Sequence, residues 1–219
     1  MARTQPSRPS ARSGSGSPSF ERRGPAIGLV LASGSPQRRA LLEALGLEIE
    51  VVEPKIEEIT EGDPEEIVLE NARWKAATVA AAARPGSLVI GGDTEVAVDG
   101  KALGQPAGEE EARGHLERLS GREHQVLGAI ALLGPDEDPT GRPAAREGVA
   151  SSTVRFRELE PALVESYLAS GEWRGRAGSY AIQGLGSALV ESVRGDVSNV
   201  IGLPVGLLLQ LAPELFAGR

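Results

Sequence analysis

The chain has 219 residues, enough for one domain with extensions or for two small domains, and long enough to bury a sizeable core. Its 23 Lys and Arg residues against 31 Asp and Glu residues give a net charge of -8, which argues against a duplex-DNA protein that relies on phosphate neutralisation. The absence of cysteine excludes disulfide scaffolds, thiolate zinc sites, iron–sulfur clusters and cysteine nucleophiles. Only two histidines are present, so a serine–histidine hydrolase or a multi-histidine metal site is poorly supplied.

The N-terminal segment differs in composition from the rest. Residues 1–26 hold five Arg, one acid and many Ser, Gly and Pro, which predicts a disordered basic tail before a folded domain at 27–215. An organelle transit peptide is the alternative, and Pro and Gly disfavour the amphipathic helix that such peptides use. No apolar run reaches the roughly 18 residues of a membrane span. The missing cysteine and export signal favour the cytoplasm, and neither nucleic acid nor membrane is expected as a partner.

Strand and helix signals alternate along the folded region. An apolar run at 27–32 predicts a buried strand, Ser35–Pro36 begins a helix as N-cap and first residue, and Gly46 ends it. A strand at 47–52 and a helix from Asp63–Pro64 to about residue 83 follow. The remaining pattern predicts strands at 88–92, 125–133, 149–157 and 187–193, helices at 109–119, 161–170 and 203–215, a hairpin turn at Asp99–Gly100 and a loop at 134–148. This mixture indicates an α/β fold with a mixed sheet.

The first cluster with chemical potential lies between a strand and a helix. Ser33, Ser35, Arg38 and Arg39 surround the expected helix start, where backbone N–H groups and the positive helix end point the same way. Hydroxyls and guanidinium groups are what a polyphosphate requires. An ordinary capped helix with solvated arginines is the alternative, because the glycine pattern of a standard phosphate loop is missing.

Two acidic clusters could hold a metal ion. Asp93 and Thr94 follow a buried strand, where a carboxylate commonly binds metal or acts as a base, although a turn is an equal alternative. Glu57 and Glu58 could supply oxygen ligands for magnesium, or could form a solvated loop. Lys75 lies among apolar helix neighbours, so it would seek an anion if it were buried.

Two later segments are weaker candidates. The glycine-rich segment 178–186 can line a pocket, and Gln183 in it offers both a donor and an acceptor for reading a base edge. The segment 195–200 is turn-like, and Asp196 is either an additional metal ligand or a turn residue.

The order and spacing of these clusters resemble the Maf family of nucleoside triphosphate pyrophosphatases. The resemblance runs from residue 27 to residue 211, and its matching stretches include LVLASGSPQRRALLEALG (29–46), LVIGGDT (88–94), DGKALGQP (99–106) and AGSYAIQGLGSALVESVRGDVSNVIGLP (177–204). It implies an elongated mixed sheet flanked by helices, with two lobes around a cleft, as in inosine-triphosphate pyrophosphatases. It also implies hydrolysis of a nucleoside triphosphate to monophosphate and pyrophosphate with Mg²⁺ or Mn²⁺, and a homodimer.

The same resemblance implies a role for each matching residue. Glu58 and Asp93 would bind the metal, Asp93 would also accept a proton from water, and Lys75 would stabilise the developing charge. Ser33, Ser35 and Arg38 would hold the phosphates. Neither Cys nor His is needed, because phosphoanhydride cleavage requires positioned water, a metal and cationic donors.

Departures from the family pattern concern substrate choice and rate. The dTTP/UTP-type members carry Arg, Thr and Gln at positions that read Gln37, Thr94 and Gln183 here, so a broader range or modified nucleotides are further candidates. Gln105 stands where the family usually has lysine, and Arg39 or Lys101 would have to compensate. The alternative function is a non-catalytic nucleotide-binding regulator of cell division on the same fold.

Overall fold

The computed structural model describes residues 28–137 and 143–217, so the expected N-terminal tail lies outside the described residues. One mixed sheet of seven strands dominates this part of the chain, in the order β2-β1-β3-β5-β6-β7 with β4 paired to β3. β1 pairs in parallel with β2 and β3, and the other pairs are antiparallel. The α/β class with a mixed sheet is therefore confirmed. The strands are β1 (Leu29–Ala32), β2 (Ile49–Val52), β3 (Leu88–Val98), β4 (Lys101–Ala102), β5 (Glu123–Glu137), β6 (Pro143–Phe156) and β7 (Val190–Arg194).

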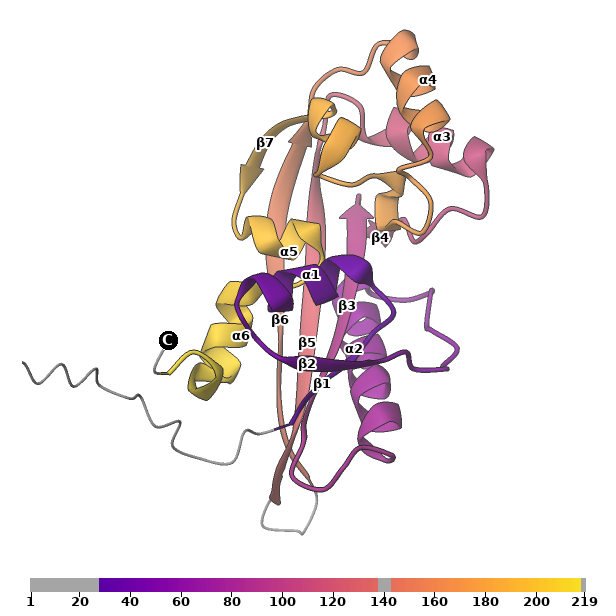
Figure 1. Ribbon diagram of the computed structural model, residues 1–219. Helices are drawn as coiled ribbons and strands as arrows, with labels where there is room; N and C mark the ends of the chain where they lie inside the picture. The colour runs from indigo at the N-terminus through magenta and orange to yellow at the C-terminus, as the bar shows by residue number, and fades with distance from the viewer. Residues whose placement is uncertain (1–27, 138–142, 218–219) are drawn as a thin grey trace, which may run out of the picture.

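Helices cover both faces of this sheet (Figure 1). They are α1 (Pro36–Ala44), α2 (Pro64–Ala80), α3 (Glu109–Leu119), α4 (Pro161–Ser170), α5 (Val197–Ile201) and α6 (Val205–Leu211), with short 3₁₀ turns η1 (Ala177–Ser179), η2 (Gly184–Ala188) and η3 (Pro213–Leu215). A Cβ on Gly91 would lie 2.2 Å from the Ala72 carbonyl oxygen of α2, and one on Gly92 would lie 3.4 Å from Nε of Arg38. Because successive strand residues point to opposite faces, α2 and α1 lie on opposite sides of β3.

The molecule has two lobes. The upper lobe, as Figure 1 is oriented, gathers α3, α4, η1, η2 and the adjoining ends of β3, β5 and β6 around a core that includes Leu116, Phe156 and Tyr167. The lower lobe holds two further apolar clusters, one between the sheet and α2 and one between the sheet and the helices α1 and α6. No helix in the described residues is long and apolar enough to cross a bilayer.

Capping and turn residues determine where the helices and strands near the site begin and end. The Ser35 hydroxyl accepts from the Arg38 backbone N–H at the start of α1, and Gly46 ends that turn with φ of +73°. Asp63 caps α2 by accepting from two backbone N–H groups. Asp99 and Gly100 both have positive φ, as a type I′ hairpin turn requires. These sequence predictions are confirmed.

Three predicted segments differ in the structure. The prediction of a loop at 134–148 is wrong for its described ends, because β5 extends to Glu137 and β6 begins at Pro143, and the two strands pair there in antiparallel. The segment 195–200 is largely helix α5, which Asp196 caps by accepting from the Ser198 N–H. The expected closing helix at 203–215 is divided into α6 and η3 at Ala212.

Candidate active site

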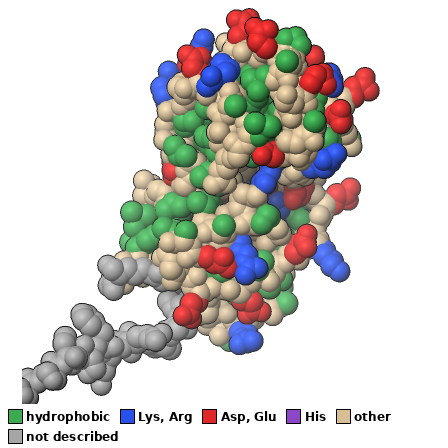
Figure 2. Space-filling model, turned by 45° about the horizontal axis from the view of Figure 1, so that its top comes forward, with side chains coloured by type: hydrophobic (Ala, Val, Ile, Leu, Met, Phe, Trp, Pro, Cys, Tyr) green, Lys and Arg blue, Asp and Glu red, His purple; other side chains and the backbone are tan. Residues whose placement is uncertain are grey.

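The site begins where β3 loses a neighbour. β1 pairs with β3 only as far as Ala32 opposite Gly91, and β4 starts pairing at Ala97. Among the described strands, residues 92–95 of β3 therefore have β5 as a partner on one side only. Side chains from both faces of β3 reach the space left at this open edge. A cleft of about 720 Å³ lies there, and Figure 2 shows basic and acidic side chains in the hollow between the lobes.

The cleft brings together every residue to which the family resemblance assigns a role in metal, substrate or proton handling. They come from the β1–α1 turn, the loop before α2, α2 itself, β3 and the upper lobe. They are Ser33, Ser35, Gln37, Arg38, Glu58, Lys75, Asp93, Thr94 and Gln183. Glu57 and Asp196 are not among the lining residues, and the Asp196 carboxylate is occupied as a helix cap. Of the two interpretations of Asp196, the structure favours the turn residue over the metal ligand.

Lys75 joins two carboxylates on the α2 side of β3. Its side chain is 7% exposed, and its Nζ lies 2.7 Å from Oδ1 of Asp93 and 2.6 Å from Oε1 of Glu58. Burial of an ammonium group is tolerated when it is paired in this way. The lysine therefore fixes the positions of two acids that come from separate segments.

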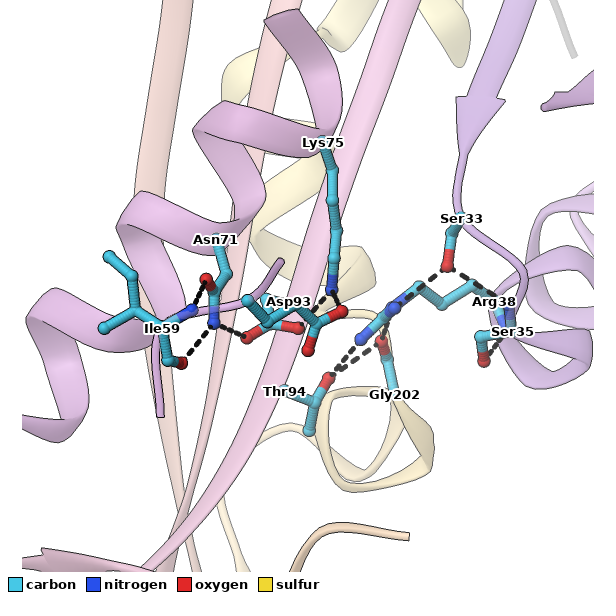
Figure 3. A network of polar contacts seen from close by, with 10 residues as sticks. Ser33, Ser35, Arg38, Ile59, Asn71, Lys75, Asp93, Thr94 and Gly202 are labelled. Atoms are coloured by element: carbon cyan, nitrogen blue, oxygen red, sulfur yellow. Dashed lines mark hydrogen bonds and ion pairs between the residues drawn. The ribbon is translucent and has the colours of Figure 1, made fainter. Parts of the chain in front are cut away.

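Asn71 completes this cluster, and the sequence analysis missed it. Its Nδ2 donates to Oδ2 of Asp93 at 3.3 Å and to the Ile59 carbonyl at 3.0 Å, and its Oδ1 accepts from the Ile59 N–H at 2.8 Å (Figure 3). Asn71 thus ties β3 to the loop that carries Glu58. Its spacing of four residues from Lys75 places both side chains on one face of α2, and that spacing was the available signal.

Arg38 organises the opposite face of β3. Its Nε donates to the Gly202 carbonyl at 2.9 Å, Nη1 to the Ser33 hydroxyl at 2.9 Å and Nη2 to the Thr94 hydroxyl at 3.0 Å (Figure 3). The residue is 8% exposed. Burial lowers the pKa of Arg38, and the nearby charges of Asp93 and Glu58 oppose that shift. The arginine therefore holds three segments together at the bottom of the cleft.

The β1–α1 turn is closed by its own side chains. The Ser35 hydroxyl donates to Oε1 of Gln37 at 3.2 Å and accepts from the Arg38 N–H at 3.4 Å. The Ser33 hydroxyl accepts from the Ser35 N–H at 3.2 Å. Ser35 is thus a helix cap and a cleft residue at once, whereas Arg38 is buried and not solvated.

The carboxylates of the cleft suit a divalent metal ion whose remaining ligands come from a substrate. The described residues contain no group of three or more His, Asp or Glu side chains that could enclose a metal ion by themselves. Glu58 and Asp93 are nevertheless held near each other by their shared contact with the Lys75 ammonium, and Mg²⁺ in nucleotide sites is usually bound by one or two carboxylates together with phosphate oxygens. The two carboxylates fit a metal of that kind.

The upper lobe contributes cations that the sequence analysis did not select. Arg174 and Arg176 line the cleft together with Gln105 and Gln183. Arg39 instead pairs with Glu43 on the surface of α1, and neither Arg39 nor Lys101 lines the cleft. The structure therefore gives no support to compensation for Gln105 by Arg39 or Lys101, which stays a prediction. The two arginines flank Gly175, just before the glycine-rich segment 178–186, and the sequence analysis considered only the glutamine of that segment.

A buried polar pair supports this upper wall. Nε2 of His124 lies 2.8 Å from the Tyr180 hydroxyl, and Phe156 contacts both rings edge-on. Burial lowers the pKa of His124 to about 4 and raises that of Tyr180. The histidine is thus neutral at pH 7, and it contacts a tyrosine that lines the cleft.

Comparison with known proteins agrees with this geometry. Residues 28–215 match the family described as "Maf-like protein". The chain belongs to the Maf family.

Its relatives include proteins named "dTTP/UTP pyrophosphatase". The one from Deinococcus radiodurans is 42% identical over 184 residues, covering 84% of this chain and 90% of the relative. The one from Symbiobacterium thermophilum is 40% identical over 196 residues, covering 87% and 97%. Among solved structures, the Ham1 protein of Staphylococcus aureus is 20% identical with a TM-score of 0.39, covering 58% of this chain and 71% of that one.

Proposed function

We propose that this Maf-family protein hydrolyses nucleoside triphosphates to nucleoside monophosphate and pyrophosphate with the help of Mg²⁺ or Mn²⁺. One observation carries the proposal. The Glu58–Lys75–Asp93 cluster and the Ser33–Arg38 turn come from segments that are distant in sequence, and they line one cleft. The names of the relatives, each about 40% identical over most of its length, support the same reaction.

The proposed mechanism assigns one task to each part of the cleft. Water attacks phosphorus, the anhydride P–O bond breaks with its electron pair leaving on pyrophosphate, and the Asp93 carboxylate accepts the proton of the water. Lys75 and Asn71 orient that carboxylate through its two oxygens. A divalent ion held by Glu58 and Asp93 would neutralise phosphate charge and make the water more acidic. Ser33 and Arg38 face the phosphates from the other side of β3.

Gln37 bears on which nucleotides the protein prefers as substrates. Thr94 and Gln183 match the dTTP/UTP-type pattern, and both line the cleft. Gln37 lacks the fixed charge and the two-pronged donor of arginine, and its side chain is held by Ser35. We therefore propose dTTP and UTP as substrates, with a tolerance for modified pyrimidine nucleotides. We also propose that the protein acts in the cytoplasm as a homodimer, which light scattering after gel filtration tests.

A panel of triphosphates tests the function. Pyrophosphate release is measured for canonical and base-methylated nucleotides with Mg²⁺, with Mn²⁺ and with a chelator. We expect turnover that depends on the metal and is fastest with dTTP or UTP. Measurable binding without turnover of any member of the panel would exclude the enzyme and leave the alternative of a non-catalytic nucleotide-binding regulator.

A further inference from the structure

The two cations of the lower wall already have protein partners. Lys75 is shared between Glu58 and Asp93, and the guanidinium of Arg38 donates to two hydroxyls and a backbone carbonyl. A triphosphate ends in a group that, like a phosphomonoester, carries about -1.5 to -2 charge near pH 7. Apart from the proposed divalent ion, the lower wall therefore has no uncommitted cation among these two for the most negative part of the substrate.

The upper wall supplies further cations. In the described part of the chain, the guanidinium groups of Arg174 and Arg176 form no ion pair with a carboxylate, although both residues line the cleft. The guanidinium carbon of Arg174 lies 4.7 Å from the centre of the Trp173 ring, so this arginine is held against the indole. Arg176 has no comparable contact, and it is the cation of the upper wall that is available to a ligand.

One atom of Arg176 points to a missing acceptor. Its Nε is buried and has no hydrogen-bond partner. Within residues 28–137 and 143–217, two other side-chain atoms share this condition, on His124 and Asn199, and neither residue lines the cleft. A buried donor without an acceptor costs about 1–3 kcal/mol, and the protein leaves this guanidinium incompletely hydrogen-bonded.

The backbone holds Arg176 at a fixed place relative to Asp93. The Gly178 N–H donates to the Gly104 carbonyl at 2.8 Å, and the Gly178 Cα packs so closely on Val96 that a Cβ would lie 2.8 Å from its side chain. Val96 is three residues beyond Asp93 on β3, which is about 10 Å along the strand. The arginine segment and the carboxylate are therefore offset along the cleft, as the two ends of a chain-like ligand require.

We propose that Arg176, with the charge of Arg174 beside it, binds the β- and γ-phosphates that leave as pyrophosphate. This inference rests on the proposed function, and it adds a subsite for the leaving group opposite the Ser33–Arg38 turn. Planar guanidinium groups are suited to this task because they donate two parallel hydrogen bonds to phosphate oxygens.

The test compares Arg176→Gln and Arg176→Lys with Arg84→Gln, a control with the same charge change on an exposed arginine outside the cleft. Binding of inorganic pyrophosphate is measured by calorimetry, and product inhibition is measured separately for pyrophosphate and for the nucleoside monophosphate. For Arg176→Gln we expect pyrophosphate binding to weaken about 10- to 100-fold, the loss of a charge-assisted hydrogen bond, with a similar rise in KM. Inhibition by the monophosphate should change less than about twofold.

The outcomes separate this inference from the proposed function. Unchanged pyrophosphate binding in Arg176→Gln, or equal weakening of pyrophosphate and monophosphate inhibition, overturns the inference even if the wild type is an active enzyme. Pyrophosphate binding that depends on Arg176 in a protein without turnover supports the subsite and rejects the enzyme. If Arg176→Gln does not fold, Arg176→Lys decides: it keeps the charge without the fork, and pyrophosphate binding as tight as in the wild type overturns the inference.

Discussion

Glu95 allows a sharp test of how burial and charge act in this fold. Its carboxylate is 8% exposed and accepts from the N–H groups of Val96 and Gly104, both at 2.9 Å. Burial raises its pKa from 4.5 to about 7, with Asp93 and Glu58 adding to the shift. The folded state therefore binds more protons than the unfolded state between these two values, so Glu95 lowers the free energy of unfolding as pH rises from about 4.5 to 7. At about 1.4 kcal/mol per pH unit, the loss is about 3 kcal/mol.

His124 opposes this loss over nearly the same pH interval. Its pKa falls from 6.5 to about 4 on burial, so the folded state binds fewer protons than the unfolded state between those values. Its contribution to stability is complete above pH 6.5 and is lost progressively as pH falls towards 4. The two effects are similar in size and opposite in sign, so a wild-type profile conceals both.

The substitution Glu95→Gln separates them. The amide oxygen can still accept from both N–H groups, and the titrating proton is gone. We expect the free energy of unfolding of the variant, relative to that of the wild type, to rise by about 3 kcal/mol between pH 4.5 and pH 7, because the variant lacks the loss caused by Glu95. The profile of the variant then shows the contribution of His124 alone. Urea unfolding of both proteins at half-unit pH steps, in a buffer with chelator and without nucleotide, measures this difference, and the titrating groups that do not interact with Glu95 cancel. A difference between the two proteins that does not change with pH would refute the reasoning.

Three further predictions concern chemistry and packing. Asp93→Asn should reduce kcat by at least about 100-fold while circular dichroism stays that of the wild type, and near-normal turnover would show that another group accepts the proton. Gln37→Arg should raise kcat/KM for dTTP and UTP relative to purine triphosphates, and an identical substrate profile would remove position 37 as a selector. Gly91→Ala should lower the free energy of unfolding by about 1–3 kcal/mol, because the new Cβ would meet the Ala72 carbonyl at 2.2 Å. Gly114→Ala, in α3 with nothing within 4 Å, should instead stabilise by about 0.5–1 kcal/mol, and equal effects of the two alanines would contradict the packing argument.

Features encoded by a few neighbouring residues were predictable from the sequence. The caps Ser35 and Asp63, each followed by proline, and the Asp99–Gly100 turn occur where they were expected. The hairpin through 134–148 was not predictable in this way, because its glycines and prolines are turn residues by composition. Gly148 has a different reason to be small, since a Cβ there would lie 3.1 Å from Leu207 of α6. The strand structure at Gly148 therefore depends on packing against a distant helix, which the local composition does not reveal.

In the site, too, the sequence indicated which residue types are suited to the chemistry but not which partners they contact. The sequence indicated that Arg38 and Lys75 were suited to anions, but not that each already has partners inside the protein. Arg38 donates to Gly202, 164 residues away, and this bond is possible only after α5 has packed on the sheet. Once Arg38 serves to hold the cleft together, less of its donor capacity remains for substrate. The contact proposed for Arg176 would then place substrate oxygens between the two lobes, and binding of the substrate would be linked to the relative position of the lobes.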